Sequence, residues 1–490
     1  MAEGCGRQRI GVVVVAYNAS KTLAEVLDRI PEDIRVRLDS VLVCDDHSQD
    51  DTYEIALHYQ RTKPELPVVV CRRGVNLGYG GNQKAAYGWA IEHELDIVVL
   101  LHGDGQYAPE CMDDLIAPLV AEEGDAVFGS RLLIPGAARR GGMPLYKFVG
   151  NRILTTVANK MVGLQLSEWH SGYRAYKVAA LRSIPFQSNS DGFDFDVQLT
   201  VQLHEAGLRI VEVPVPTYYG TEICYVNGMQ YARDVVRDVV RYRLHKIGLG
   251  HGDLAFAENS YDLKVQETSS HTRIVSWLSG RPPKKILDLG CSDGALGQIL
   301  RRNGHHVTGV DLEEVGGVHD AIDRFIEADL EQGLANQVDS VYEVIVAADV
   351  LEHVRRPDVL LAEIAGCLTP DGTLIASVPN FAHWYPRLRV ATGRFDYDRR
   401  GILDRTHLRF FTGRSFARLA EEAGFRILRR EAIGVPLEVT GRGGGPDDVV
   451  GRHRGRFRVL LDRINRWTVA AWPSLFAYQY VYELAPKRNI

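Results

Sequence analysis

Short apolar runs alternate with segments of helical spacing along most of this chain. In the first half, the runs rich in Val and Ile predict strands, and the segments between them predict amphipathic helices. The predicted strands are Ile10–Ala16, Ser40–Cys44, Pro67–Cys71, Ile97–Leu101 and Ala126–Phe128, and the predicted helices include Thr22–Ile30, Asp51–Arg61, Asn82–Glu94 and Tyr231–Lys246. This alternation predicts a mostly parallel sheet covered on both faces.

The same alternation starts again after Pro282-Pro283. Its predicted strands are Lys285–Leu289, His306–Val310, Val344–Ala348, Gly372–Val378 and Phe476–Leu484, with helices at Leu296–Asn303, Asp358–Cys367 and Phe457–Trp472. A single core rarely serves 490 residues, so the sequence predicts two α/β domains. Glycines cluster just after residue 246, where helical spacing stops. We therefore predict domains at 1–246 and 258–490, joined by a linker at 247–257.

Composition and charge narrow the class of protein. The net charge of -6 gives no general attraction to nucleic acid, and we expect no such partner. The seven cysteines form no Cys-x-x-Cys pair, which favours a reducing cytoplasm over a disulfide framework or a zinc ribbon. No apolar stretch reaches the roughly 18 residues of a membrane span, and the N-terminus lacks the apolar core of a signal peptide. These features predict a cytoplasmic protein.

Polar residues follow two predicted strands of the first half. Asp45-Asp46-His47-Ser48 follows the strand at 40–44, and His102-Gly103-Asp104-Gly105-Gln106 follows the strand at 97–101. Carboxylates at strand ends can bind a ribose or a base, or hold a divalent cation that bridges to phosphates. Taken singly, each acid fits a helix cap or a turn equally well.

Together with further motifs, these residues resemble the family 2 glycosyltransferases over roughly Gly11 to Arg241. The resemblance is closest to the dolichol- or polyprenyl-phosphate sugar synthase branch. The other matching motifs are Ala16-Tyr17-Asn18, Asn76-Leu77-Gly78-Tyr79-Gly80-Gly81-Asn82, Gly129-Ser130-Arg131 and Ser171-Gly172-Tyr173-Arg174. The resemblance implies a GT-A-type fold and an inverting transfer from a nucleoside-diphosphate sugar to polyprenyl phosphate or a glycan.

The resemblance also implies roles for single residues. Asp104 would act at the reacting centre and hold Mg²⁺ or Mn²⁺, with Gln106 and His102 as further candidate ligands. Glu168 would orient the acceptor or act as a general base. The donor would contact Tyr17, Asn18, Asp45, Asp46, Gly78, Gln106, Arg131 and Arg174.

Two positions depart from the family pattern. His102 stands where the Asp-x-Asp motif has its first acid, and Ala19 stands where an acid often follows the Tyr-Asn pair. A catalytically silent domain that serves in binding or assembly is therefore an alternative. A polysaccharide or small-molecule acceptor is the other alternative for the first domain.

The second series opens on a glycine-rich turn. Asp288-Leu289-Gly290-Cys291-Ser292-Asp293-Gly294 ends the first strand and precedes a helix, and Asp311 ends the next strand. Glycines after a strand let the backbone approach a ligand. Asp311 follows Asp288 at the spacing of roughly 20 residues expected for a ribose-binding acid. The turn by itself also fits a dehydrogenase, and Ser292 replaces the middle glycine of the common pattern.

Further motifs resemble class I S-adenosylmethionine-dependent methyltransferases over roughly Glu258 to Leu484. They are Ala328-Asp329-Leu330, the segments 348–354 and 368–374, and the segment 404–412, which is typical of a branch that contains O-methyltransferases. The resemblance implies a Rossmann-like fold that binds S-adenosyl-L-methionine. The implied cofactor contacts are Asp288, Gly290, Ser292, Asp293, Gly294, Asp311, Asp329 and Asp349, with Glu352 shaping the pocket.

Methylation of a sugar hydroxyl needs a base, and His353 and His407 are the candidates because histidine titrates near neutral pH. A structural histidine is the alternative at each position. The whole sequence thus predicts a bifunctional enzyme of cell-envelope glycan biosynthesis, in which glycosyl transfer and O-methylation act on related substrates.

The predicted helix at 457–472 is amphipathic and basic. Its apolar residues at helical spacing are Phe457, Leu460, Leu461, Ile464 and Trp467, and its arginines, with two just before it, are Arg454, Arg456, Arg458, Arg463 and Arg466. Such a helix can lie on an anionic membrane surface, here the inner face of the membrane. The alternative is that its apolar face packs on the sheet of the second domain.

Overall fold

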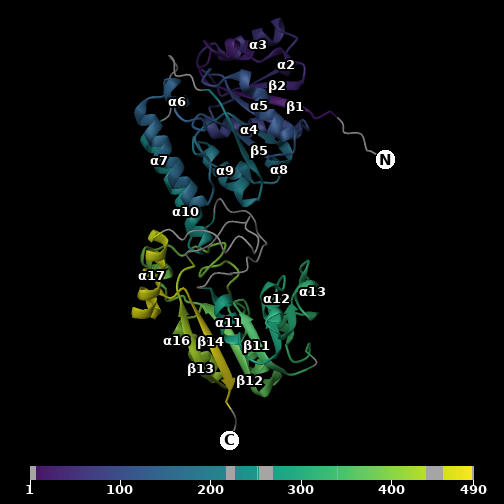
Figure 1. The fold of residues 1–490 in the computed structure, drawn as a ribbon, viewed down its shortest axis with the longest axis vertical. Helices are drawn as coiled ribbons and strands as arrows, with labels where there is room; N and C mark the ends of the chain where they lie inside the picture. The colour runs from purple at the N-terminus through teal and green to yellow at the C-terminus, as the bar shows by residue number, and fades with distance from the viewer. Residues whose placement is uncertain are drawn as a thin grey trace, which may run out of the picture. The chain divides into compact units, whose positions relative to one another are not determined.

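In a computed structural model of the protein, residues 7–216, 227–250, 252, 269–338, 340–436 and 456–487 are described. They form two compact units, and the division falls inside α10 (Gly228–Lys246), between Arg243 and Leu244. Each unit is built on one sheet (Figure 1). The prediction of two α/β domains is therefore confirmed. Ile247 and Leu249, at the start of the predicted linker, are buried in the second unit.

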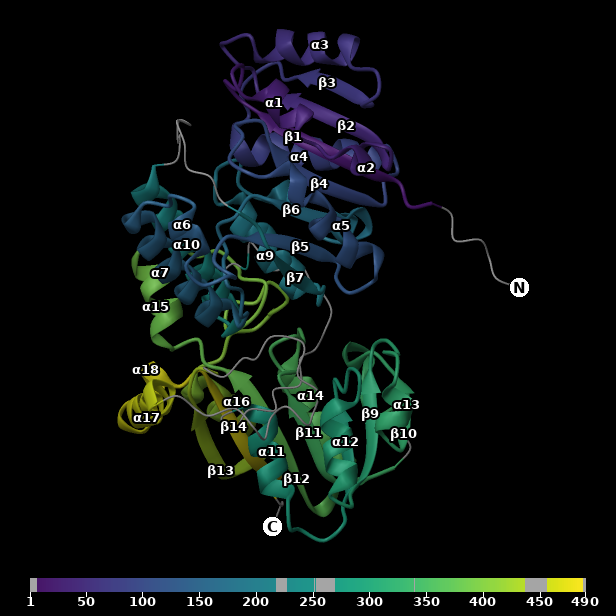
Figure 2. The same ribbon diagram turned by 45° about the horizontal axis from the view of Figure 1, so that its top comes forward.

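Among the described residues, the first unit has a seven-stranded sheet in the order β3-β2-β1-β4-β6-β5-β7 (Figure 2). Strand β6 runs antiparallel to both neighbours, and the other pairs are parallel. The strands are β1 (Ile10–Ala16), β2 (Leu38–Asp45), β3 (Val68–Arg72), β4 (Ile97–His102), β5 (Ala126–Ser130), β6 (Arg174–Lys177) and β7 (Ile210–Pro214). The chain builds outward from β1 to β3 and then returns to β4 on the other side of β1.

Strand β1 shows why helices cover both faces of this sheet. Val13 and Val15 belong to one core, and Val12 and Val14 belong to the other. Successive side chains of a strand point to opposite faces, so an uninterrupted run of valines is buried only between two layers. Helices α4 and α9 line the first core, and α1 and α5 line the second. The helical segments are α1 (Leu23–Asp28), α2 (Glu32–Arg35), α3 (Thr52–Thr62), α4 (Gly78–Glu92), η1 (Pro109–Cys111), α5 (Met112–Val120), α6 (Ala137–Arg140), α7 (Leu145–Val162), α8 (Val178–Arg182), η2 (Phe186–Ser188) and α9 (Phe195–Glu205).

The sheet of the second unit has the order β10-β9-β8-β11-β12-β14-β13 within the described residues. Strand β14 runs antiparallel to β12 and β13, and the other pairs are parallel. The strands are β8 (Lys285–Leu289), β9 (His306–Asp311), β10 (Arg324–Glu327), β11 (Tyr342–Ala348), β12 (Leu368–Pro379), β13 (Phe425–Ile433) and β14 (Gln479–Pro486).

Helices cover both faces of the second sheet as well. Leu287 and Leu289 lie in a core lined by α14 and α16, and Ile286 lies in a core lined by α11 and α12. The helical segments are α11 (Ser270–Leu278), α12 (Ala295–Arg302), α13 (Val318–Ala321), η3 (Leu330–Gln332), α14 (Pro357–Cys367), α15 (Trp384–Ala391), α16 (Gly413–Glu422), α17 (Arg456–Ala471) and α18 (Pro473–Phe476). In the part of the chain that the structure describes, no helix has both the length and the apolar character needed to cross a membrane.

Candidate functional sites

The carboxyl ends of β1, β2 and β4 lie at one edge of the first sheet. Ala16 pairs with Asp45, and Val15 pairs with His102, so the three strands end at nearly the same level. The strand order reverses between β1 and β4, and ligands of open α/β sheets bind at such a point. The fold therefore brings together the loops that contain Tyr17, Asp46 and Asp104, as the sequence predicted.

Asp45 and Asp46 have different surroundings. The Asp46 carboxylate accepts the backbone N–H groups of Leu77 at 2.8 Å and Gly78 at 3.0 Å, and so anchors the start of α4. Burial raises the pKa of Asp46, although these two hydrogen bonds oppose the rise. The Asp45 carboxylate is buried and lies 3.4 Å from Nε of Arg72. The geometry thus favours a loop-anchoring role for Asp46.

The loop after β1 is fixed through Asn18, which has a φ of +48°. Its backbone N–H donates to the Ser48 hydroxyl at 2.9 Å, and its side-chain oxygen accepts the Gln49 N–H at 2.9 Å. Next to these hydrogen bonds in the chain, Tyr17 is 39% exposed. Gly78 has a φ of +79°, and an added Cβ would meet a backbone oxygen at 2.7 Å, so only glycine suits this start of α4.

His102 is part of a half-buried hydrogen-bonded chain. Its Nε2 lies 3.2 Å from the Tyr79 hydroxyl, which donates to the Asp196 carboxylate at 2.8 Å. Burial lowers the pKa of His102, although the charges of Asp104 and Asp196 oppose this. An added Cβ on Gly172 would lie 2.7 Å from both His102 Nε2 and the Tyr79 hydroxyl. This arrangement favours a structural role for Nε2 over the predicted contact with a metal.

Asp104 is a half-buried carboxylate at the same edge. Its Oδ1 accepts the backbone N–H of Gln106 at 3.0 Å, which closes a turn. Within the described residues, no group of three His, Cys, Asp or Glu side chains close enough to hold a metal includes Asp104. Hard divalent cations take oxygen ligands and are often bound by one carboxylate plus substrate phosphates. Asp104, with the amide oxygen of Gln106, fits a cation bound mainly through a diphosphate.

Arg131 and Glu168 form a buried ion pair. The carboxylate accepts the Arg131 backbone N–H at 2.7 Å, its Nε at 2.9 Å and its Nη2, and also the Asn151 amide at 2.6 Å. Burial alone would raise the pKa of Glu168, but the Arg131 charge and these hydrogen bonds outweigh it and hold the pKa below its usual value. A carboxylate stabilised in this way is a weak proton acceptor, so the geometry favours a positioning role over general base catalysis.

Arg174 lies at the start of β6 and is 1% exposed. Its guanidinium donates to the backbone oxygens of Ser171, Asp196 and Trp169 and to the Thr200 hydroxyl, at 2.8 to 3.0 Å. These hydrogen bonds hold the guanidinium of Arg174 in the protein interior. The structure therefore favours a structural role for Arg174 over the predicted contact with phosphate.

The glycine-rich turn of the second unit follows β8 at the centre of its sheet. Gly290, Ser292 and Gly294 all have positive φ values, of +68°, +51° and +77°. A Cβ added to Gly290 would lie 2.9 Å from the Val350 side chain, so the turn has no space for a larger residue at this position. The Ser292 N–H donates to the Asp311 carboxylate at 2.7 Å, which ties the turn to the end of β9.

Asp288 ends β8 below this turn and is 2% exposed. Its Oδ2 is buried and has no hydrogen-bond partner among the described residues. Burial, and then the charge of Asp311, raise the pKa of Asp288 to about 7. A cationic or hydrogen-bonding ligand would stabilise this buried carboxylate, because it would supply the partner that Oδ2 lacks among the described residues. S-adenosyl-L-methionine carries an ammonium and a sulfonium, so the turn and this orphaned oxygen fit it.

The other predicted cofactor acids also have local partners. Asp293 accepts the Ala295 N–H at 3.1 Å, and Asp329 accepts the Glu331 N–H at 2.9 Å at the start of η3. Asp349 has a φ of +58° and accepts the Ser377 hydroxyl at 2.7 Å. The Asp349 carboxylate also accepts the amide of Gln479 from β14. Asp349 therefore joins the ends of β11, β12 and β14.

His353 and His407 come from distant segments, yet their rings pack edge to face with centroids 4.8 Å apart. His353 Nδ1 lies 3.2 Å from the Thr406 oxygen, and His407 Nδ1 lies 3.2 Å from the Ile402 oxygen. A carbonyl oxygen only accepts, so each neutral ring carries its proton on Nδ1 and leaves Nε2 able to accept one. Burial, and then the neighbouring His353, lower the pKa of His407. A neutral ring whose Nε2 can accept a proton is the form that a general base requires.

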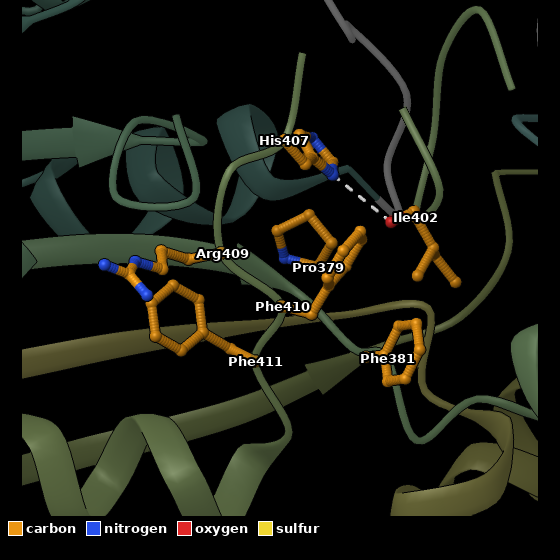
Figure 3. A pocket seen from close by; sticks show the side chains of 7 residues that line it. All are labelled: Pro379, Phe381, Ile402, His407, Arg409, Phe410 and Phe411. Atoms are coloured by element: carbon orange, nitrogen blue, oxygen red, sulfur yellow. Dashed lines mark hydrogen bonds between the residues drawn. The ribbon is translucent and has the colours of Figure 1, made fainter. Parts of the chain in front are cut away.

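Figure 3 shows His407 at an aromatic-lined pocket after β12. The lining includes Pro379, Phe381, Phe410 and Phe411, and the dashed bond joins His407 to Ile402. The carboxylate of Glu352 and the ring nitrogens of His353 and His407 lie within 4.8 Å of one another. The two predicted bases thus share one site in the second unit.

Sequence reasoning missed three residues that hold these sites. Asp196 on α9 holds Tyr79, Asn151 on α7 contacts Glu168, and Gln479 contacts Asp349. Each contact joins segments far apart in the chain, so no local pattern marks it.

Comparisons with known proteins match the two halves of the chain to different families. The glycosyl transferase family 2 matches residues 11–184, and a methyltransferase domain matches residues 263–430. The undecaprenyl-phosphate mannosyltransferase of Micrococcus luteus is 31% identical over 42% of this chain and 82% of its own length. The ubiquinone biosynthesis O-methyltransferase of Aeromonas salmonicida is 32% identical over 31% of this chain and 66% of its own length. Glucosyl-3-phosphoglycerate synthase from Mycobacterium tuberculosis, solved with Mn²⁺ and uridine-diphosphate, is 23% identical over 49% of this chain and 80% of that chain, with a TM-score of 0.37.

The chain belongs to glycosyl transferase family 2 and carries a methyltransferase domain after it. It is an enzyme with a glycosyltransferase and a methyltransferase domain. The first unit has the predicted GT-A-type fold, and the second has the predicted Rossmann-like class I methyltransferase fold. Both predictions are confirmed.

Proposed function

We propose that the first unit transfers a sugar, with inversion, from a nucleoside-diphosphate donor to polyprenyl phosphate. The second unit then methylates a hydroxyl of a related sugar or glycolipid with S-adenosyl-L-methionine. The observation that carries the first part is the common edge where β1, β2 and β4 end, with Asp45 and Asp104 on neighbouring loops. The likeness to a polyprenyl-phosphate mannosyltransferase supports a lipid-phosphate acceptor.

In the first unit, Asp104 and Gln106 would hold Mg²⁺ or Mn²⁺, which offsets the charge of the departing diphosphate when bound. Asn18 and Asp46 fix the loops on either side of that point, and Tyr17 offers an exposed ring for the base. The Arg131–Glu168 pair would position the acceptor beside them.

In the second unit, Asp288 and the turn at 290–294 would bind the cofactor, and Asp311 would bind its ribose. His407 would take the proton from the acceptor hydroxyl through Nε2, oriented by its Nδ1–H bond to the Ile402 oxygen. His353 would support this proton transfer from its position against the His407 ring. We place the enzyme in the cytoplasm, at the inner face of the membrane where such acceptors lie.

A donor and acceptor screen with two site variants and one control variant tests the assignment. Purified protein is incubated with nucleoside-diphosphate sugars, polyprenyl phosphate and labelled S-adenosyl-L-methionine, and the products are identified by mass spectrometry. We expect Asp104→Asn to lower sugar transfer by roughly a hundredfold or more and to leave cofactor binding unchanged. We expect Asp288→Asn to do the reverse, and Asp114→Asn, an exposed carboxylate on α5, to change neither.

Each outcome separates the alternatives. Transfer to a glycan or a small molecule, with none to polyprenyl phosphate, would replace the proposed acceptor. Sugar transfer that Asp104→Asn leaves unchanged would remove the metal from that site. No transfer with any donor would favour a first unit that serves only in binding.

A further inference from the structure

Helix α17 packs on the second unit through its less apolar side. The Asn465 amide donates to the Val435 oxygen at 2.9 Å, and Val469 is buried in the core that contains β14. These two residues are one turn apart and lie on the same side of the helix. Leu460, Ile464 and Trp467, which the alternative packs on the sheet, are exposed instead, so the alternative is wrong for these residues.

The opposite side of α17 carries an exposed apolar stripe, made of Leu460, Ile464 and Trp467. The three residues follow one another at helical spacing, and they are 51%, 47% and 71% exposed. Trp472, just after the helix, is 56% exposed. Large apolar side chains that gather on one exposed face mark an interaction surface.

The flank of this stripe is positively charged. Arg463 and Arg466 are exposed beside it, and the acid of α17, Asp462, is half-buried. We propose that the second unit carries its own membrane-docking element, in which the stripe of α17 enters an anionic lipid bilayer and these arginines contact its headgroups. Tryptophan is favoured at the level of the headgroups, and basic amphipathic helices lie in this plane.

The dimensions and charges of α17 favour a bilayer over a second copy of the chain. A helix of 16 residues is about 24 Å long, shorter than the hydrocarbon layer of about 30 Å, so it lies along the surface. Two copies that met through this face would bring their arginines together, and the one acid of α17, Asp462, is half-buried. An anionic bilayer supplies both an apolar layer and negative headgroups.

This inference goes beyond the proposed function, because vesicle binding is measured without a donor, an acceptor or the cofactor. A failure of glycosyl transfer leaves it standing, and a failure of vesicle binding leaves the assignment of the two active sites standing. The two outcomes are therefore distinguishable.

Flotation of the full-length protein with lipid vesicles tests the proposal. We expect binding to vesicles of phosphatidylcholine with phosphatidylglycerol and little binding to phosphatidylcholine alone. The double change Ile464→Asp and Trp467→Asp should lower binding by tenfold or more. Leu428→Asp is the matched control, because Leu428 on β13 is 46% exposed, close to the value of Ile464, and lies outside the stripe. Thermal unfolding checks that all variants fold.

Charge variants give a second test. Arg463→Gln with Arg466→Gln should weaken binding by about thirtyfold at low salt, because each arginine near an anionic surface contributes about 1 kcal/mol. Arg414→Gln with Arg418→Gln removes two exposed charges from α16 as a control. Binding that the α17 variants leave unchanged, or that the control pairs weaken equally, overturns the proposal. A wild-type dimer in lipid-free gel filtration that Trp467→Asp converts to a monomer overturns it in favour of a second copy.

Discussion

Glu168 and Arg131 are joined three times: the carboxylate accepts the arginine's backbone N–H at 2.7 Å as well as two guanidinium nitrogens. The Glu168 side chain is fully buried, and that of Arg131 is 10% exposed. The pair therefore fixes the chain after β5 to the segment before β6.

Glu168→Gln should lower the free energy of unfolding by about 3–5 kcal/mol, because it leaves the Arg131 charge buried without its partner. Glu110→Gln is the control, since its pair with Arg29 at 2.8 Å is solvent-exposed and should change stability by less than about 1 kcal/mol. Denaturant unfolding of both variants gives the comparison. Equal effects of the two changes would contradict a special role for the buried pair.

Gly172→Ala should destabilise the first unit by about 1–3 kcal/mol, because the new methyl group would lie 2.6 Å from the His102 ring. The ring and the Tyr79 hydroxyl must move, so sugar transfer should fall as well. Gly150→Ala on α7 meets no atom within 4 Å and should be neutral or stabilising. Thermal unfolding and a sugar-transfer assay on both variants measure these effects. Normal transfer by Gly172→Ala would show that sugar transfer does not depend on the observed position of the His102 ring.

Asp288 should make the second unit less stable as the pH rises. Its pKa is raised from 3.8 to about 7, so the folded state binds more protons than the unfolded state between these values. Its contribution is therefore fully present below pH 4 and is lost as the pH rises through 7, a change of up to about 4 kcal/mol. Asp288→Asn should remove this slope and be the more stable form at pH 8. Unfolding curves at pH 5 and pH 8 measure this pH dependence of stability. The same change in the free energy of unfolding for the wild type and for Asp288→Asn would contradict the expectation.

Binding of S-adenosyl-L-methionine should show the opposite dependence on pH. A cationic ligand favours the ionised carboxylate, so affinity should fall about tenfold for each pH unit below the pKa of Asp288, near 7. Calorimetric titration across this range gives the slope. A flat profile in the wild type, or the same slope in Asp288→Asn, would show that the cofactor does not contact this residue.

His407→Gln should lower methyl transfer by about 10²–10⁴-fold while cofactor binding stays unchanged. Burial lowers the pKa of His407, so the ring remains a base as the pH falls below 6.5, and the acidic limb of the wild-type profile should lie below that value. His319→Gln, an exposed histidine on α13, is the control. A pH profile of methyl transfer that His407→Gln leaves unchanged would assign the proton to another group.

The strands in the middle of both sheets could be predicted from the sequence alone. The prediction Ile10–Ala16 coincides with β1, because a strand buried on both faces needs an unbroken apolar run. The prediction Lys285–Leu289 coincides with β8, where the buried Ile286, Leu287 and Leu289 mark the strand although Lys285 is exposed. Strand β13 was not predicted. It lies at the edge of its sheet, and five of its nine residues, Arg426, Leu428, Arg429, Arg430 and Glu431, are charged or exposed, so its pattern resembles a loop.

The sites and α17 also combine features that the sequence predicts with features that only the packed structure decides. The motifs around Asp104 and Asp288 are local, so the sequence by itself determined to which loops we assign the chemistry. Only the tertiary structure decided that His102 binds Tyr79, that Arg174 is committed to the interior, and that α17 turns its apolar stripe away from the core. The contacts of His102 with Tyr79, and of Arg174 with Asp196 and Thr200, join segments more than 20 residues apart, so they form only when the packed layers bring these side chains together.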